Sequence, residues 1–369
     1  MTNVGSVNRF VSLCVYNATK SVVQKPKMIP VLKSGLKALT PVFKSVNPKT
    51  HQVSIEEVKS LFIDGKMDGG ILQDEMLALK IRLFFNSIFD IHKLKLWKHS
   101  VDLSKKLTTQ DYKDIAELMN LHNGKFIDKW RGFSDFDDIP NFQKLALFVR
   151  SMKRTNQLSF FKNLSEQEWA TCVDGIVNRP KEVIRPLLEY KFNSTNINWG
   201  LTKGYCKNEI YEKIKKIDQF LDTQKTRCKL DVYRGEGQFG IFSQIKPDKK
   251  TTLDKILERY TDEINHGVHS QNEIKEFINK KILSVELTQN RFMSTGLTRK
   301  AGEDYAKKLL WNISVPEGTK ASMIEGYNVE RKAEYELLIQ RDSILKIKDA
   351  IFDHDNHRWE MWVDLLQQS

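Results

Sequence analysis

The chain has 369 residues, of which 40% are hydrophobic, and its formal net charge is +12. This length accommodates two domains, and no stretch approaches the roughly 20 continuous apolar residues that a membrane span needs. The four cysteines are scattered, without C-x-x-C pairs or metal-ligand spacing. They argue against a disulfide framework and fit a reducing working compartment.

The basic charge is concentrated at the N-terminus. Residues 1–55 contain eight of the 59 lysines and arginines and no acidic residue, so the rest of the chain has a surplus of only four positive charges. A nucleic-acid-binding protein would need a basic patch on its folded part. We therefore expect no nucleic-acid partner.

Residues 1–53 are interpreted as a basic, disordered tail for targeting or secretion. Prolines break any long helix, and no apolar core followed by a small-residue cleavage site indicates a conventional signal peptide. An acid-free, hydroxyl-rich start is typical of a transit peptide, a leader for a non-cleaving secretion machine or a lipid-binding arm, and a solvated tail is an equal alternative. Residues 31–44 favour a basic amphipathic helix, so weak contact with a membrane or a secretion chaperone is expected.

Residues 54–158 have a helical pattern and are predicted to form a separate domain. Ser54, Thr108 and Ser165 each precede an acidic residue by three positions, which is typical of a helix start. Apolar residues recur at helical spacing through residues 77–91 and 115–121. The aromatic residues of this region are expected to form the core of a helical bundle: Phe84, Phe85, Phe89, Trp97, Trp130 and Phe148.

After about residue 225 the pattern changes to short β-rich runs separated by turn residues, which predicts a mixed α+β domain. Helices are expected over residues 253–265 and 301–309. Strands are expected over residues 229–233, 284–288, 310–315, 334–339, 343–347 and 358–364.

The tripeptide Glu334-Tyr335-Glu336 opens one of these strands. Two carboxylates at positions i and i+2 of a strand point to the same face, where they repel each other. Such a pair suits chemistry on a cationic or electron-poor centre. By itself, however, the tripeptide is better explained as a solvated strand face.

Two further motifs precede this tripeptide. Arg234 leaves a strand directly before Gly235, where a guanidinium can make a bidentate contact with phosphate. Ser294 and Thr295 form a hydroxyl pair at the start of a later strand. Each motif alone would be interpreted as a turn or a surface.

In this order, aromatic-Arg-Gly, Phe-x-Ser-Thr and Glu-x-Glu, the motifs resemble the arginine/serine/glutamate class of mono-ADP-ribosyltransferases, most of all bacterial toxins and effectors. The resemblance covers roughly residues 160–369 and includes the segments around Tyr190 and Asn198. It implies an ADP-ribosyltransferase fold over residues 159–369, with two packed, roughly perpendicular β-sheets and flanking helices, preceded by the helical region.

The resemblance implies transfer of ADP-ribose from NAD, as co-substrate, to a protein side chain, with release of nicotinamide and some hydrolysis of NAD. By position, Glu336 would bind the nicotinamide ribose, and Glu334 would orient and deprotonate the acceptor. Arg234 would hold the phosphates. Ser294 would hydrogen-bond to Glu336, and Thr295 would support the strand. A glutamate at the first acid position favours arginine as the acceptor.

Four more residues receive binding roles from the same resemblance. Gly235 and Glu236 would present backbone to the nicotinamide amide, and Tyr190 and Asn198 would be wall and phosphate contacts. This sequence departs from the family pattern at three positions, which concern NAD contacts and acceptor recognition: Gly296, Thr202 and Arg331.

Other kinds of site are weakly supported. The pair His354 and His357 has H-x-x-H spacing but is interpreted as a polar turn, so no metal is expected. Residues 235–240 are glycine-rich but lack the context of a phosphate-binding loop.

We expect the protein to be a secreted toxin that acts in the host cytosol. Its expected partner there is a host protein, either actin or another arginine-bearing target. The alternatives are a phage-delivered transferase acting inside an infected bacterium, or an inactive binding protein on the same fold.

Overall fold

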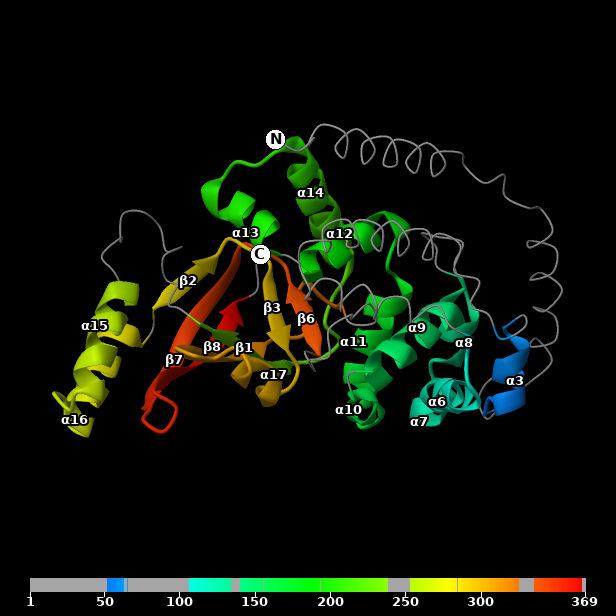
Figure 1. The fold of residues 1–369 in the computed structure, drawn as a ribbon, viewed down its shortest axis with the longest axis horizontal. Helices are drawn as coiled ribbons and strands as arrows, with labels where there is room; N and C mark the ends of the chain where they lie inside the picture. The colour runs from blue at the N-terminus through cyan, green and yellow to red at the C-terminus, as the bar shows by residue number, and fades with distance from the viewer. Residues whose placement is uncertain are drawn as a thin grey trace, which may run out of the picture. The chain divides into compact units, whose positions relative to one another are not determined.

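The computed structural model describes residues 52–62, 65, 106–133, 140–154, 156–192, 194–237, 253–283, 285–324 and 335–366. The chain divides into two compact units, Met1–His51 and Gln52–Ser369. The described residues, which are coloured in Figure 1, belong to the second unit. Residues 31–44 and 77–91, Arg331 and Glu334 therefore lie outside the described residues. In the described part, no helix is long and apolar enough to cross a membrane.

Short helices make up the first part of this unit. Ser54, Thr108 and Ser165 each accept a hydrogen bond from a backbone N–H three residues on, while the acid there bonds back, so the predicted helix starts are confirmed. The helices of this part are α3 (Ile55–Ser60), α6 (Thr109–Met119), α7 (Leu121–Gly124), α8 (Ile127–Arg131), α9 (Asn141–Arg154), α10 (Leu158–Lys162) and α11 (Glu166–Val177).

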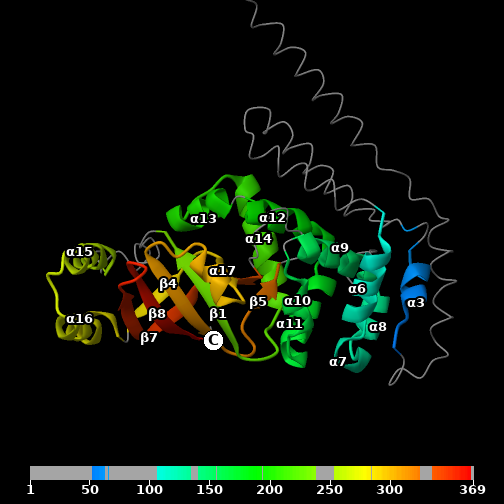
Figure 2. The ribbon, with the colours of Figure 1, turned by 60° about the horizontal axis from the view of Figure 1, so that its bottom comes forward.

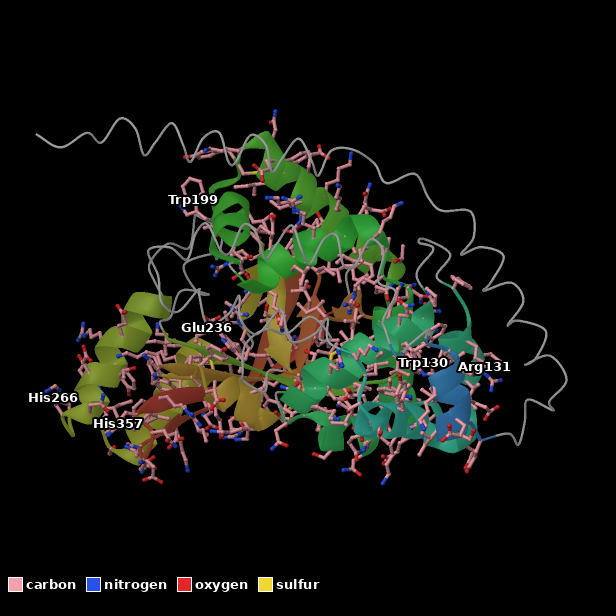
Figure 3. All side chains as sticks on the ribbon, turned by 45° about the vertical axis from the view of Figure 1, so that its right-hand side comes forward. Trp130, Arg131, Trp199, Glu236, His266 and His357 are labelled. Carbon is pink, nitrogen blue, oxygen red and sulfur yellow. The ribbon has the colours of Figure 1, made fainter. Side chains whose placement is uncertain are left out.

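These helices enclose an apolar cluster that runs from Val53 to Val177 and also includes Met323 of the sheet. Trp130, which is labelled in Figure 3, and Phe148 are fully buried in it, as predicted. The other four aromatics of the predicted bundle core lie outside the described residues. The cluster is continuous across residue 158, and the boundary there stays a prediction.

The second part is built on one eight-stranded mixed sheet, in the order β2-β7-β8-β4-β1-β3-β6-β5 (Figure 1). Neighbouring strands are antiparallel except β4 and β8. The strands are β1 (Leu230–Glu236), β2 (Glu286–Gln289), β3 (Met293–Gly296), β4 (Leu309–Val315), β5 (Ala321–Met323), β6 (Glu336–Ile339), β7 (Ser343–Asp353) and β8 (Arg358–Leu366).

Few backbone pairs connect the two parts of the sheet, which are β2-β7-β8-β4-β1 and β3-β6-β5. β1 pairs with β4 over seven residues, but with β3 only through Tyr233 and Gly296. Side chains from both parts, such as Val232 and Leu337, lie in the same apolar cluster. Two packed sheets were expected from the sequence; the structure has one sheet, whose two parts are joined through this single residue pair.

Helices flank this sheet on several sides (Figures 1 and 2). α12, α13 and α14 share a third apolar cluster that includes Phe292 and Leu338. α15 contributes Leu257 to the main cluster of the sheet. The helices are α12 (Lys181–Phe192), α13 (Ser194–Lys203), α14 (Asn208–Thr223), α15 (Leu253–Asn265), α16 (Gln271–Phe277), the π-helix Ile278–Ile282 and α17 (Arg299–Glu303).

Several predicted elements differ in extent from the structure. β1 continues through Glu236, so Arg234 lies within the strand and does not leave it as expected. The helix expected over residues 301–309 is the shorter α17, because Leu309 and Leu310 already pair with β1. The strand expected from residue 334 begins at Glu336, because Tyr335 has φ 45°, which a strand does not accommodate. Glu334 lies outside the described residues, so the argument that both glutamates share one strand face stays a prediction.

Candidate active site

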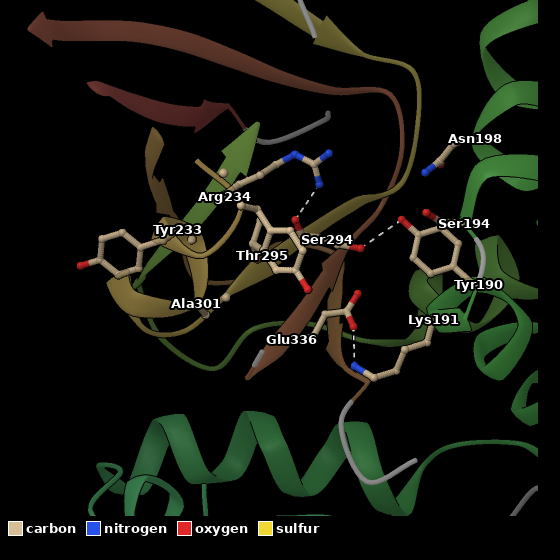
Figure 4. Close-up of a pocket in the computed structure, with 14 residues that line it drawn as sticks. Tyr190, Lys191, Ser194, Asn198, Tyr233, Arg234, Ser294, Thr295, Ala301 and Glu336 are labelled. Atoms are coloured by element: carbon tan, nitrogen blue, oxygen red, sulfur yellow. Dashed lines mark hydrogen bonds and ion pairs between the residues drawn. The ribbon is translucent and has the colours of Figure 1, made fainter. Parts of the chain in front are cut away.

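A cavity of about 400 Å³ opens where α12 and α13 face β1, β3 and β6 (Figure 4). It is lined by residues from segments far apart in the sequence. These are Tyr190, Lys191, Ser194, Asn198, Tyr233, Arg234, Gly235, Ser294, Thr295, Gly296, Ala301, Gly302, Tyr305 and Glu336.

Arg234 links the two parts of the sheet beside their single backbone pair. Its Nε donates to Oε1 of Glu236 at 2.7 Å, and its Nη1 donates to the carbonyl of Ser294 at 2.7 Å. Burial lowers the pKa of Arg234, but the neighbouring Glu236 carboxylate outweighs burial, and the net change in pKa is upward. The guanidinium is thus held in place as a permanent cation on the cavity wall.

The hydroxyl of Ser294 faces Tyr190 of α12. Tyr190 donates to the Phe292 carbonyl at 3.2 Å, and its oxygen lies 3.2 Å from Oγ of Ser294. Since a phenol has one proton, Ser294 is the donor in the second contact. Burial raises the pKa of Tyr190, and the charge of Glu336 adds to the rise, so the phenol stays neutral. The hydrogen bond from Ser294 to Glu336 stays a prediction.

Glu336 is the first residue of β6, and its carboxylate is held by a lysine. Nζ of Lys191 lies 2.6 Å from Oε2 of Glu336, and the two side chains are 9% and 8% exposed (Figure 4). Gly296 pairs with Glu336 on one side and with Tyr233 on the other. Gly296, which departs from the family pattern, therefore lies between β1 and β6 and lines the cavity.

Gly235 and Glu236 have different surroundings. A Cβ at Gly235 would lie 2.1 Å from the carbonyl oxygen of Gly302, so only glycine allows the end of α17 to pack against β1. The carbonyl of Glu236 accepts from the backbone N–H of Lys308 at 3.0 Å, and Glu236 does not line the cavity. Glu236 therefore reaches the site through its contact with Arg234.

The remaining predicted site residues divide by their contacts. Thr295 lines the cavity, but its buried hydroxyl donates to the Leu337 carbonyl at 2.9 Å and ties β3 to β6. Asn198 also lines the cavity, and its buried Oδ1 has no hydrogen-bond partner in the described part of the chain. A polar ligand can supply that missing donor. Thr202 is exposed on α13.

The sequence did not reveal Lys191 as a site residue. It directly follows Tyr190, yet a lysine near the end of an amphipathic helix is ordinary. Its importance depends on a contact with a residue 145 positions away. His354 and His357 lie in the turn after β7, where His354 contacts Gln271 and His357 contacts Asn265. No group of possible metal ligands occurs among the described residues.

Comparison with solved structures finds matches over part of this chain. Plx2a, an ADP-ribosyltransferase toxin from Paenibacillus larvae, is 19% identical with a TM-score of 0.43, over 59% of this chain and 97% of that one. C3stau2 from S. aureus with NAD is 17% identical with a TM-score of 0.42, over 60% and 96%. The C3 exoenzyme of Clostridium limosum is 18% identical with a TM-score of 0.39, over 66% and 100%.

The fold is that of the ADP-ribosyltransferase toxins, with flanking helices and a helical N-terminal part, as predicted, and its strands form one eight-stranded mixed sheet. The family model of the ADP-ribosyltransferase exoenzymes matches residues 181–367. The chain belongs to the ADP-ribosyltransferase exoenzyme family. No curated protein sequence matches it.

Proposed function

We propose that this protein transfers ADP-ribose from NAD to an arginine side chain of another protein and releases nicotinamide. The observation that carries the proposal is the convergence of Arg234, Ser294 and Glu336, from three separate strands, on one cavity. The NAD found with the similar S. aureus protein supports NAD as the co-substrate.

The charges of the described lining suit this substrate. Lys191 and Arg234 are cationic and Glu336 is anionic, which leaves a net positive wall for a pyrophosphate. Arg234 would hold the phosphates. The unpartnered Oδ1 of Asn198 would accept a hydrogen bond from the nucleotide.

In the proposed reaction, the bond between ribose C1′ and the nicotinamide nitrogen breaks, and its electron pair leaves with nicotinamide. Positive charge develops at C1′, and the nearby Glu336 carboxylate would stabilise it, as carboxylates do in glycoside hydrolysis. A guanidine nitrogen of the acceptor then bonds to C1′ as its proton is released. Arginine is almost always protonated in water, so this step needs a base, for which Glu334 is proposed.

We further propose that the protein acts as a secreted toxin on a host protein, actin or another arginine-bearing target, in the host cytosol. Residues 1–53 would serve secretion, through a chaperone or weak membrane contact. Delivery by a phage into a bacterium would use the same chemistry. An inactive binding protein on the same fold is a second candidate. Such a protein would have no need to keep Arg234, Ser294 and Glu336, and their presence in this sequence therefore favours the enzyme.

Labelled NAD incubated with the protein and a cell lysate tests the proposal. We expect labelled protein bands from the wild type and a loss of about 10²- to 10³-fold for Glu336→Gln, because a preorganised charge is removed from the reacting centre. Glu286→Gln, at an exposed position on β2, is the control and should label normally. Equal labelling by Glu336→Gln would contradict the assignment, and a label that resists neutral hydroxylamine would exclude arginine as the acceptor.

A further inference from the structure

Lys191 is a cation in the cavity that takes part in no step of the proposed reaction. It extends from α12, and its ammonium is 2.6 Å from the carboxylate of Glu336, which begins β6. Both side chains are more than nine-tenths buried. A buried ammonium is costly unless it is paired, so its placement requires a compensating contact.

The other polar groups near Glu336 have different contacts. The guanidinium of Arg234 is engaged by Glu236 and by the Ser294 carbonyl. The Ser294 hydroxyl contacts Tyr190. Lys191 supplies a direct charged contact to the Glu336 carboxylate.

A carboxylate that must face the ribose needs both its charge and one fixed orientation. An ammonium bound to one oxygen restricts rotation of the carboxylate. Because the lysine is delivered by a helix and the glutamate by a strand, their contact also fixes α12 against β6. Misplacing a reacting group by about 1 Å can cost about 10²-fold in rate.

We infer that Lys191 is a positioning residue for the reaction: it holds the Glu336 carboxylate oriented toward the ribose, and it acts through Glu336 rather than on the phosphates. The inference rests on the proposed function. Its alternative is that Lys191 leaves Glu336 and binds the pyrophosphate.

Kinetics of NAD consumption separate these roles. For Lys191→Met we expect kcat to fall by about 10- to 10²-fold while KM for NAD changes less than about threefold. Lys191→Arg, which keeps the charge, should recover most of the lost kcat. The matched control is Lys213→Met, because Lys213 pairs with Glu189 at the same 2.6 Å outside the cavity. This control should keep wild-type kcat.

Binding of ADP-ribose, measured by calorimetry, reports on the phosphates without any reaction. Lys191→Met should bind ADP-ribose as the wild type does. A dissociation constant raised about tenfold, with kcat retained, would show that Lys191 binds phosphate. A kcat for Lys191→Met equal to or above that of the wild type would also overturn the inference.

A substrate-free measurement keeps the inference testable even if the wild type consumes no NAD, a result that would refute the proposed function alone. Denaturant midpoints are compared for Lys191→Met, Glu336→Gln and the double variant. We expect the double variant to shift by less than the two single shifts together. Additive shifts would mean that the two side chains do not hold each other.

Discussion

The ring of Tyr335 packs against the ring of Phe160, with centroids 4.4 Å apart. Tyr335 lies between the two predicted catalytic glutamates, and Phe160 lies on α10 of the helical part. The Tyr335 carbonyl also accepts from the backbone N–H of Leu297 at 3.0 Å. The helical part thus supports the backbone turn that directs Glu336 into the cavity.

Replacing Phe160 with alanine should therefore impair catalysis from outside the cavity. We expect Phe160→Ala to lower kcat for transfer by about tenfold, because Tyr335 loses its packing partner and the turn before Glu336 loosens. The measurement is the initial rate of protein labelling at saturating NAD. Phe160→Leu, which keeps most of the apolar contact, is the control, and an unchanged rate for Phe160→Ala would contradict the coupling.

The two glutamates should differ in their mutant phenotypes. We expect Glu334→Gln to abolish labelling of protein while NAD is still hydrolysed to ADP-ribose, because water needs less activation than a protonated guanidinium. Protein-bound label and free ADP-ribose are measured in one reaction. If Glu334→Gln loses both activities, the proposed division of roles between the acids fails.

Gly235 should tolerate no side chain. A Cβ there would lie 2.1 Å from the Gly302 carbonyl oxygen, whereas a Cβ at Gly237 meets nothing within 4 Å. We expect Gly235→Ala to cost about 1–3 kcal/mol in the free energy of unfolding and to reduce activity strongly. Gly237→Ala is the matched control and should resemble the wild type. Similar denaturant midpoints for the two variants would show that α17 moves away at little cost.

Asp111 of α6 should make stability depend on pH. Burial alone would raise the pKa of Asp111, but hydrogen bonds from the Thr108 N–H and from Lys153 outweigh burial and hold the pKa below its usual 3.8. A carboxyl with a lowered folded-state pKa stabilises the fold above its unfolded-state pKa, and this contribution is lost as pH falls through the folded-state value.

We therefore expect Asp111→Asn to cost about 1.5–3 kcal/mol at pH 7, with the difference from wild type shrinking below about pH 3.8. Denaturant unfolding at several pH values measures this difference. Asp128→Asn, at an exposed position on α8, is the control and should cost less. A difference for Asp111→Asn that stays constant at acid pH would exclude the ion pair as its cause.

Removal of residues 1–50 should leave purified activity intact, because Met1–His51 forms a unit apart from the one that holds the cavity. The measurement compares kcat and the denaturant midpoint of the shortened and full-length proteins. A large fall in kcat would mean that the tail belongs to the catalytic part.

Much of the local structure was predictable because it depends on neighbours in the sequence. The capping boxes at Ser54, Thr108 and Ser165 need only a hydroxyl and an acid three residues on. The helix Leu253–Asn265 and the strands around Arg234 and Ser294 follow from apolar periodicity and β-branched residues. Where periodicity was misleading, at α17 and at the start of β6, strand pairing and a left-handed residue determined the backbone.

The sequence by itself determined the order of the site motifs, the helix caps and the family resemblance, since these are patterns of residue type and spacing. Only the tertiary structure decided that Lys191 contacts Glu336, that Arg234 bridges to the Ser294 carbonyl, and that Tyr335 packs against α10. Those contacts join residues 60 to 175 positions apart. They depend on how helices and strands pack in space, which local propensity does not encode.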